Sequence, residues 1–537
     1  MSRYIAERAP TLAPQGMVAS PHALASEAGV AALRAGGSAV DAAIAANAVL
    51  SVAYPHMCGV GGDAVCLTYD ARSREVRALV AAGRAPAAAT LQEFERRGLK
   101  EIPPRSLLAV TVPGAVDGWA EAHRTYGRLS WRALFEAAID SAREGIPVTP
   151  KLRGWIERRL SLLSAHPTTA KIFLPDGTIP QTGDRLVQLD LARTLEVIAQ
   201  EGRQGFYQGE IARAIVAFSR ASGGLHTEAD FAAQRSEWAE PLMGSYRGVA
   251  IFQTPPPSQG FVSLLMLHML EEDDVGALDY LGPDHLHLLV EVKKIAFADR
   301  NRHLADPVFV KVPTTQFLSN TYARERRQLI HPDRAWIWDQ VPRGSLEGDT
   351  VYVAAVDAEG NAASLTQSLY MGFGSGIVAG NTGVLLHNRG AYFSLDPSQP
   401  NRLEPGKRPM HTLMASLAFR GERLWLVFGC MGADGQPQIH VQVYSALLDH
   451  GLDLQAAIEA PRWLAGRFVI GDPREFLTLE ARIPPQTHQA LEARGHAVKV
   501  GEPWDELTGH AHGVIILENG VKVGAADPRS DGAAIGY

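Results

Sequence analysis

Cysteine is scarce in this chain, and its scarcity excludes several classes of protein. Cys58, Cys66 and Cys430 are the only cysteines in 537 residues. Three cysteines cannot form a disulfide framework, and their spacing, like that of the histidines, lacks the pattern of a metal site. We therefore expect no structural disulfide, no bound metal and a reducing compartment.

Long apolar runs and basic clusters are absent as well. No segment holds about 18 apolar residues without charges or turn formers, and the first residues lack the apolar core of a signal peptide. The net charge is -7, and no Lys/Arg-rich run suggests a phosphate-binding surface. A content of 46% hydrophobic residues supports a large core. The expectation is a cytoplasmic globular protein without a membrane or nucleic-acid partner.

The pattern of apolar residues divides the chain into a helical part and a part rich in strands. Residues 22–53 predict two helices joined at Gly36-Gly37, with Ser38 capping the second. A hairpin is predicted over 63–83, helices over much of 131–220, and a proline-bearing loop at 254–260 between a strand and a helix. Later strands are predicted at 351–357, 362–369, 382–388, 411–419 and 423–429. A polar span near 331–349 precedes them.

The stretch TVYVAAVDAEGNAASLTQSL predicts a hairpin that begins at Thr350. Gly360 suits the left-handed position of a three-residue turn closed by Asp357 and Asn361. That turn places Thr350 opposite Ser368, so two hydroxyls meet at one end of the hairpin.

A threonine becomes its own nucleophile and base when it is N-terminal, because a free α-amino group has a pKa of about 8. Cutting between Asp349 and Thr350 would create that group. The Thr350 hydroxyl can make the cut itself by attacking the preceding carbonyl. The stretch alone also fits an ordinary strand that begins with threonine.

The same stretch resembles the start of the small subunit in the γ-glutamyltranspeptidase family of N-terminal nucleophile hydrolases. Thr350, the Gly360-Asn361 turn, Thr366, Ser368 and the FGSG motif at 373–376 carry the resemblance. Further matches follow in order along nearly the whole chain, among them PHMCGVGGDA, VPGAVDGW, YRGVAIFQTPPPSQG, AFADRNRHLADP and PGKRP.

The resemblance implies a fold, a processing step and a set of catalytic residues. The fold is α+β, an αββα sandwich of two stacked antiparallel sheets flanked by helices. A mostly helical fragment 1–349 and a nucleophile-bearing fragment 350–537 would build it together as one structural unit. Thr350 would be the nucleophile, Thr366 and Ser368 supporting hydroxyls, and Gly432 and Ala433 the oxyanion donors. No cofactor is implied, and a homodimer of processed pairs stays open.

The substrate-binding positions depart from those of true γ-glutamyl enzymes. The family arginine that holds the α-carboxylate falls in register on Ala82, while Arg84 stands two positions later. The usual serine pair becomes His411 and Thr412. Where the family holds the α-ammonium with an asparagine, a glutamine and an acid, this chain has Tyr370, Arg389 and Tyr392.

These replacements remove the partner of an ammonium and add a positive charge. Unless an acid such as Asp63 folds into the gap, the pocket fits an acyl group without an amine and with a carboxylate, which arginine binds in bidentate fashion. The pattern resembles the branch of cephalosporin acylase-like and oxamate amidohydrolase-like proteins. The expected function is hydrolysis of a small oxamate-like or glutaryl-like amide through an acyl-enzyme. Glutathione hydrolysis or γ-glutamyl transfer remains an alternative, as does a non-catalytic protein that binds small acids.

Overall fold

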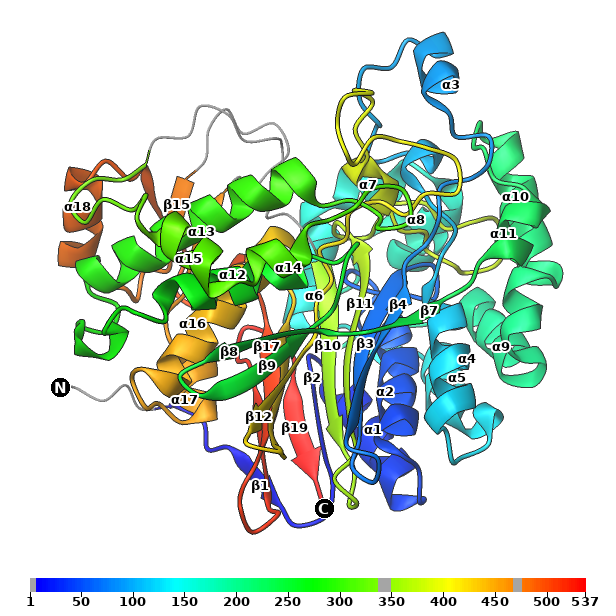
Figure 1. Cartoon of the computed structure of the whole chain (residues 1–537). Coiled ribbons are helices and arrows are strands. Elements are labelled where there is room, and N and C mark those ends of the chain that lie inside the picture. Colours follow the sequence, from blue (N-terminus) through cyan, green and yellow to red (C-terminus); the bar gives the residue numbers. More distant parts are fainter. Residues whose placement is uncertain (1–5, 337–348, 467–475) are drawn as a thin grey trace.

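Two seven-stranded sheets pack face to face, and helices cover the outer face of each (Figure 1). The computed structural model describes residues 6–336, 349–466 and 476–537. This four-layer α+β arrangement is the αββα sandwich that the sequence predicts. The polar span near 331–349 lies partly outside the described residues.

The strands of each sheet come from both ends of the chain. One sheet has the order β1 (Thr11–Ala13), β18 (Lys522–Ala526), β17 (Ala511–Ile516), β13 (Arg423–Cys430), β12 (Ser416–Arg420), β9 (Val249–Gln253) and β8 (Leu242–Tyr246). The other has the order β19 (Ala533–Gly536), β2 (Met17–Ser20), β10 (Asp349–Val356), β11 (Ala362–Tyr370), β3 (Asp63–Asp70), β4 (Glu75–Ala81) and β7 (Glu237–Ala239). Both sheets therefore contain strands from before and after residue 350.

Strand β10 is buried on both faces, because successive side chains point to opposite sides of a strand. Val351, Val353 and Ala355 join the core beneath the helices. Tyr352 and Ala354 join the core between the two sheets. The start of β10 consequently lies deep inside the molecule.

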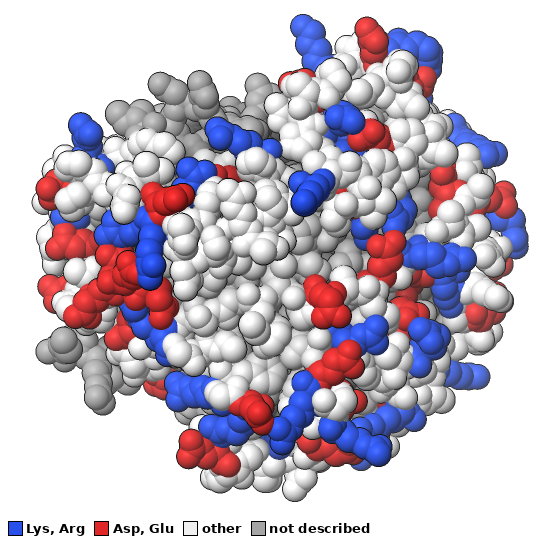
Figure 2. All heavy atoms as spheres, in the orientation of Figure 1, with Lys and Arg blue, Asp and Glu red and all other residues white. Residues whose placement is uncertain are grey.

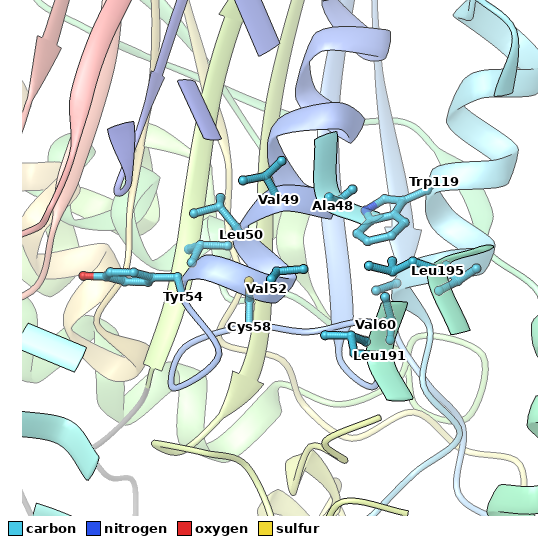
Figure 3. Packing of buried hydrophobic residues seen from close by; sticks show 14 of the residues in the cluster. Ala48, Val49, Leu50, Val52, Tyr54, Cys58, Val60, Trp119, Leu191 and Leu195 are labelled. Atoms are coloured by element: carbon cyan, nitrogen blue, oxygen red, sulfur yellow. The ribbon is translucent and has the colours of Figure 1, made fainter. Parts of the chain in front are cut away.

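The outer helices begin with the predicted pair, α1 (Ala23–Arg34) and α2 (Ala39–Ala53). Helix α2 packs on β10 and β11, and α1 packs on α2, β2 and β19. Ser38 caps α2 in a capping box with Asp41. Every residue of α2 is buried, and its apolar side chains pack near Trp119 and Leu195 (Figure 3). The same layer contains α4 (Ala115–Tyr126), α5 (Glu136–Glu144), α6 (Pro150–Arg158), α9 (Leu189–Tyr207) and α10 (Glu210–Ala221).

The opposite layer covers β9, β12 and β13. It consists mainly of α12 (Gly260–Leu270), α13 (Pro283–His303), α16 (Gln436–Leu448) and α17 (Leu454–Glu459). Shorter helices complete the fold: α3 (Leu91–Arg96), α7 (Leu160–Ser164), α8 (Pro167–Phe173), α11 (Glu228–Ala233), α14 (Thr314–Phe317), α15 (Asn320–Arg327) and α18 (Pro485–Ala493). A three-stranded sheet of β14 (Trp463–Gly466), β15 (Phe476–Leu479) and β16 (Val498–Val500) and a two-stranded one of β5 (Ile146–Pro147) and β6 (Arg185–Leu186) stand apart.

Two of the predicted strands are wrong or too long. Residues 382–388 form no strand, and the strand predicted at 411–419 begins only at Ser416. Both segments bond instead to loops: the Ser375 N–H donates to the Leu386 carbonyl at 2.8 Å, and the Gln259 N–H to the His411 carbonyl at 3.0 Å. The loop predicted at 254–260 does connect β9 with α12.

The surface gives no sign of a specialised electrostatic face in the view shown. Lysine and arginine alternate with aspartate and glutamate around the margin of the molecule (Figure 2). Within the described residues, no helix has the length and apolar character needed to span a bilayer.

Candidate active site

Thr350 and Ser368 face each other at one end of the hairpin formed by β10 and β11. Thr350 Oγ1 donates to Ser368 Oγ at 3.2 Å, and both residues are 1% exposed. Val351 pairs with Gln367, which is the predicted register, and an irregularity in the pairing falls between Asp349 and Val351. Irregularities of this kind redirect side chains beside active sites.

The turn of this hairpin also has the predicted form. Gly360 has a φ of 87°, in the left-handed region. The Asp357 N–H donates to the Asn361 carbonyl at 3.1 Å. Local turn chemistry thus sets the register that brings the two hydroxyls together.

Arg389 is buried next to this hydroxyl pair. Its Nη2 donates to Ser368 Oγ at 3.3 Å and its Nη1 to Thr412 Oγ1 at 2.7 Å, while Nε has no partner. Among the side chains that the structure describes, no carboxylate lies within ion-pair distance of this guanidinium. Burial lowers the pKa of Arg389 from its usual value, yet arginine stays charged in proteins. The site therefore contains a buried cation whose nearest acids, Asp63 and Asp434, act on it only from beyond ion-pair distance.

Two tyrosines flank the Arg389 guanidinium. It lies 4.5 Å from the centre of the Tyr370 ring, and the Tyr370 and Tyr392 ring centres are 4.7 Å apart. Tyr370 has a φ of 78°, which is unusual for a bulky residue, and its N–H donates to Ser368 Oγ at 2.7 Å. This backbone conformation aims the Tyr370 amide at the same oxygen that Thr350 and Arg389 contact.

Asp63 lies near the site, but its carboxylate is already engaged. It accepts hydrogen bonds from the N–H groups of Gly83 and Gly114 at 2.9 and 3.0 Å. His411 Nε2 is 3.2 Å from it, and His387 Nδ1 is 3.6 Å away. Burial lowers the pKa of His411 to about 4, so this imidazole is neutral near pH 7. Asp63 thus anchors the backbone and the imidazoles behind Arg389.

Asp434 is the second acid at the site, and it too has partners. Its Oδ1 accepts from Arg300 Nη1 at 2.6 Å and from the Tyr392 hydroxyl at 3.0 Å. Both acids are thus already engaged by groups of the protein, and the charge of Asp434 is compensated by Arg300.

The predicted oxyanion loop follows β13. Gly432 and Ala433 have φ values of 131° and 43°, and neither N–H has an acceptor among the described residues. Gln259 Nε2 donates to the Ala433 carbonyl at 2.9 Å. A Cβ on Gly429 would lie 2.4 Å from the Tyr352 ring, so the end of β13 lies against the start of β10. Two free N–H donors therefore lie at the same end of the sandwich as Thr350.

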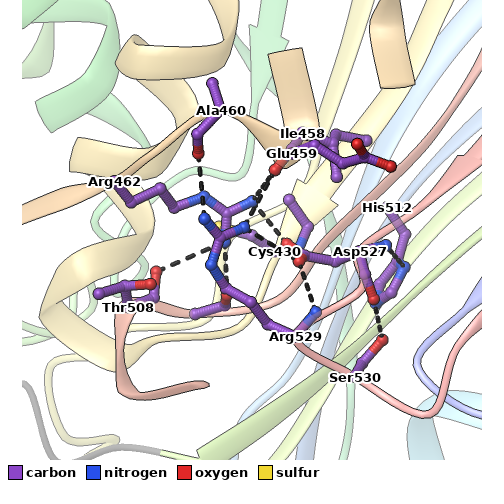
Figure 4. Close-up of polar contacts among 12 residues, drawn as sticks. Cys430, Ile458, Glu459, Ala460, Arg462, Thr508, His512, Asp527, Arg529 and Ser530 are labelled. Carbon is purple, nitrogen blue, oxygen red and sulfur yellow. Dashed lines mark hydrogen bonds and ion pairs between the residues drawn. The ribbon is translucent and has the colours of Figure 1, made fainter. Parts of the chain in front are cut away.

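A buried ionic network supports this loop from behind (Figure 4). Arg462 pairs with Asp527 at 2.5 Å and donates to the Gly509 carbonyl. The next residue, His510, accepts a 2.9 Å hydrogen bond from the Met431 N–H. The network fixes the backbone immediately before Gly432.

Two of the predicted site residues make their side-chain contacts outside this cluster. Arg84 pairs with Glu237 at 2.5 Å and is 4.0 Å from Asp306, in an ion-pair cluster of its own. Thr366 Oγ1 donates to the Met414 carbonyl at 2.8 Å, which ties β11 to a neighbouring segment. The other predicted residues gather around Ser368, Arg389 or the oxyanion loop.

Sequence reasoning missed the partners that surround the predicted site. His387, Asp434 and Arg300 belong to the site through contacts across the fold. His387 stands two residues before Arg389, and no motif marks it. Arg300 lies in AFADRNRH, a segment that supported the family resemblance without pointing to this contact.

Comparison with known proteins identifies the family. The family model described as gamma-glutamyltranspeptidase matches residues 25–537. The chain belongs to the gamma-glutamyltranspeptidase family. It is therefore an enzyme of the N-terminal nucleophile hydrolase class, as the resemblance predicted.

Curated and structural relatives cover almost the whole chain. The Glutathione hydrolase-like YwrD proenzyme of Bacillus subtilis is 41% identical over 97% of this chain and 98% of its own length. The Oxamate amidohydrolase proenzyme of Klebsiella pneumoniae is 38% identical over 97% of this chain and 98% of its length. The crystal structure of cephalosporin acylase from Bacillus halodurans superimposes with a TM-score of 0.92 at 36% identity, covering 99% of this chain and 98% of that one. The αββα fold is thereby confirmed.

Proposed function

We propose that the chain is a self-cleaving amidohydrolase with Thr350 as its nucleophile, acting on small amides whose acyl part carries a carboxylate and no amino group. The observation that carries the proposal is the buried guanidinium of Arg389, which among the described residues has no carboxylate within ion-pair distance and is bonded to the same hydroxyl as Thr350. An oxamate amidohydrolase among the relatives supports the same substrate class.

The first step is cleavage between Asp349 and Thr350. Thr350 Oγ1 attacks the carbonyl carbon of residue 349, its proton passes to the departing amide nitrogen, and an ester replaces the peptide bond. Water then hydrolyses the ester and leaves a free amine on Thr350. The 3.2 Å contact with Ser368 orients the attacking oxygen. Several relatives carry the word proenzyme in their names, which supports this step.

Turnover uses the amine that cleavage releases. The α-amino group of Thr350 accepts the proton of its own hydroxyl while Oγ1 attacks the substrate carbonyl. The N–H groups of Gly432 and Ala433 stabilise the negative charge on the carbonyl oxygen, a contribution of about 3 kcal/mol for each donor. The amide nitrogen leaves with a proton from the α-ammonium group, and water hydrolyses the acyl-enzyme.

The position of Arg389 favours a carboxylate close to the scissile carbonyl. Its Nη2 and Thr350 Oγ1 both hydrogen-bond to Ser368 Oγ, so the guanidinium lies close to the attacking oxygen. In an oxamate-like donor the carboxylate is bonded directly to the amide carbon, so both groups can reach their partners at once. A glutaryl group places three methylenes between them and would have to fold back. A short acid amide is therefore the preferred substrate, and the glutaryl amide is the second candidate.

An ammonium group has no such partner in this pocket. Asp63 and Asp434 are already hydrogen-bonded, and Tyr370 and Arg389 occupy positions that hold ammonium partners in γ-glutamyl enzymes. Burying an unpaired ammonium costs several kcal/mol, which corresponds to roughly 100-fold or more in kcat/KM. We expect γ-glutamyl donors to be poor substrates.

The deciding experiment compares three donors on the purified, processed enzyme. Ammonia release from oxamate, and aniline release from a glutaryl and a γ-glutamyl anilide, give three values of kcat/KM. We expect oxamate first and the γ-glutamyl anilide last. A clear preference for the γ-glutamyl anilide would favour glutathione hydrolysis, the activity in the names of several relatives. No turnover by fully cleaved protein would leave only the acid-binding alternative.

A further inference from the structure

Three potential metal ligands meet between α13 and the segment that follows α18. His287 and Glu291 lie one turn apart on α13, and His496 follows α18. All three residues are buried, and one ligand atom from each lies within 4.8 Å of the others. The sequence shows no metal-ligand spacing for this cluster, because His287 and His496 are 209 positions apart.

The tautomer of His287 is fixed by its neighbours. Its Nε2 lies 2.8 Å from the His331 carbonyl, which can only accept a hydrogen bond. Nε2 therefore has the proton, and Nδ1 accepts a hydrogen bond from His496 Nε2 at 2.8 Å. An ion that binds both nitrogens would replace this hydrogen bond, with the His496 proton moving to its Nδ1. A histidine that ligates a metal usually donates its other ring N–H to a carbonyl or carboxylate in this way.

Glu291 is fixed in position as well. Its Oε1 accepts from Lys294 Nζ at 2.6 Å and its Oε2 from the Trp336 N–H at 2.9 Å. Each carboxylate oxygen has more than one lone pair, so both can keep these contacts and still face an ion. The Lys294 ammonium opposes a second cation, which favours moderate affinity over very tight binding.

We propose that His287, Glu291 and His496 bind a divalent transition-metal ion of the zinc type. Two imidazoles and one carboxylate are a ligand set that Zn²⁺ accepts, with a fourth position left for water. The hard ions Mg²⁺ and Ca²⁺ prefer oxygen ligands and would bind poorly. The site is separate from Thr350, and ion binding does not depend on the proposed reaction; only the role as a clip between fragments rests on the proposed cleavage.

The ion would connect two parts of the chain. His287 and Glu291 precede residue 349, and His496 follows it, so the ion would bridge the two fragments after cleavage. The Trp336 N–H also donates to Glu291, and Lys294 donates to the Trp336 carbonyl. Trp336 precedes Asp349 by 13 positions in the sequence. The proposed role is therefore a clip between the fragments.

The test is direct metal binding by the purified full chain after EDTA treatment. Calorimetric titration with ZnCl2 should give one ion per chain, and Co²⁺ should give the visible absorption bands of a low-symmetry nitrogen and oxygen site. His496→Gln and Glu291→Gln should each weaken binding at least about tenfold. His450→Gln is the matched control, because His450 packs against His285 of the same helix with ring centres 4.9 Å apart and no third ligand in that group.

Any of three results would overturn the site. One is the absence of saturable Zn²⁺ or Co²⁺ binding by the wild-type chain at millimolar ion. Another is unchanged binding in Glu291→Gln, an isosteric change that keeps the fold even where a histidine replacement does not. Equal weakening by His450→Gln would also count against it, since that result would indicate a general effect on α13.

Discussion

Arg389 Nη2 and Ser368 Oγ are joined by a 3.3 Å hydrogen bond, so the buried cation and Thr350, the proposed nucleophile, contact one hydroxyl. The same oxygen accepts the Tyr370 N–H at 2.7 Å. Ser368 Oγ thus contacts Thr350, Arg389 and the backbone of Tyr370. A change to any of these groups should alter the position of the Thr350 hydroxyl.

Thr350→Ala should leave a single folded chain of full length. Without the hydroxyl no acyl shift can begin, while the buried packing of β10 stays almost unchanged. Intact-mass measurement should show fragments 1–349 and 350–537 for the wild type and one species for the variant. Wild-type protein that remains uncut while hydrolysing amides would contradict the mechanism.

Ser368→Ala should slow both self-cleavage and turnover. Loss of one hydrogen bond to the nucleophile is worth about 1 to 3 kcal/mol on the barrier, or roughly 5- to 150-fold in rate. Thr366→Val is the control from the same strand, because its hydroxyl bonds the Met414 carbonyl and should affect stability more than rate. Equal rates for Ser368→Ala and the wild type would show that Ser368 does not orient Thr350.

Arg389→Met should abolish the preference for acid amides. A bidentate carboxylate contact in a buried site is worth several kcal/mol, so kcat/KM for oxamate should fall by roughly 100-fold or more, mainly through KM. Arg84→Ala is the matched control, since its guanidinium pairs with Glu237. If Arg84→Ala impairs oxamate hydrolysis as much as Arg389→Met does, the carboxylate site has been assigned to the wrong arginine.

Restoring the family residues should move the specificity toward γ-glutamyl donors. The triple variant Tyr370→Asn, Arg389→Gln and Tyr392→Asp replaces a cation with two ammonium acceptors and an acid. Asparagine tolerates the left-handed backbone at position 370, where φ is 78°. The ratio of kcat/KM for γ-glutamyl and glutaryl anilides should rise at least about tenfold, and an unchanged ratio would contradict the assigned pocket.

Stability should fall as the pH drops from about 6.5 toward 4. Burial lowers the pKa of His226 to about 4, so in this window the unfolded chain binds a proton that the folded chain does not. The contribution is fully present above the unfolded pKa and amounts to ~3 kcal/mol. The comparison uses the uncut Thr350→Ala variant with and without His226→Gln. Between pH 7 and 4, the free energy of unfolding should fall less in the variant that carries His226→Gln. The free energy of unfolding is measured in urea, and parallel pH profiles for the two proteins would contradict the prediction. His440 offers a second test, because burial lowers its pKa to about 3.

The features that depend on residues close together in the chain could be predicted from the sequence. The Gly360 turn sets the hairpin register, and that register alone brings Ser368 to Thr350. Ser38 marks the start of α2 because a capping box needs only neighbouring residues. The family resemblance then supplied the positions of Arg389 and of the oxyanion loop.

What depends on packing between distant segments could not be predicted. His411 and Asp63 are 348 positions apart, and nothing in either segment indicates their 3.2 Å contact. Arg84 lies near a family motif but pairs with Glu237, which another strand supplies. The segment at 382–388 has the apolar pattern of a strand, yet its backbone bonds to loops around the site.

The mixed origin of the strands in each sheet also fixes the order of folding and cleavage. In one sheet β2 lies between β19 and β10, and β11 pairs with β3; in the other, β1 pairs with β18 and β9 with β12, so strands from the two sides of residue 350 are hydrogen-bonded to each other in both sheets. These sheets can assemble quickly only while one chain holds the strands together, because separate pieces would have to find each other by diffusion. Folding therefore comes first and the cut second. A processed enzyme that has been denatured should regain little activity, whereas uncut Thr350→Ala should refold. The broken bond between residues 349 and 350 therefore marks a molecule that has already folded.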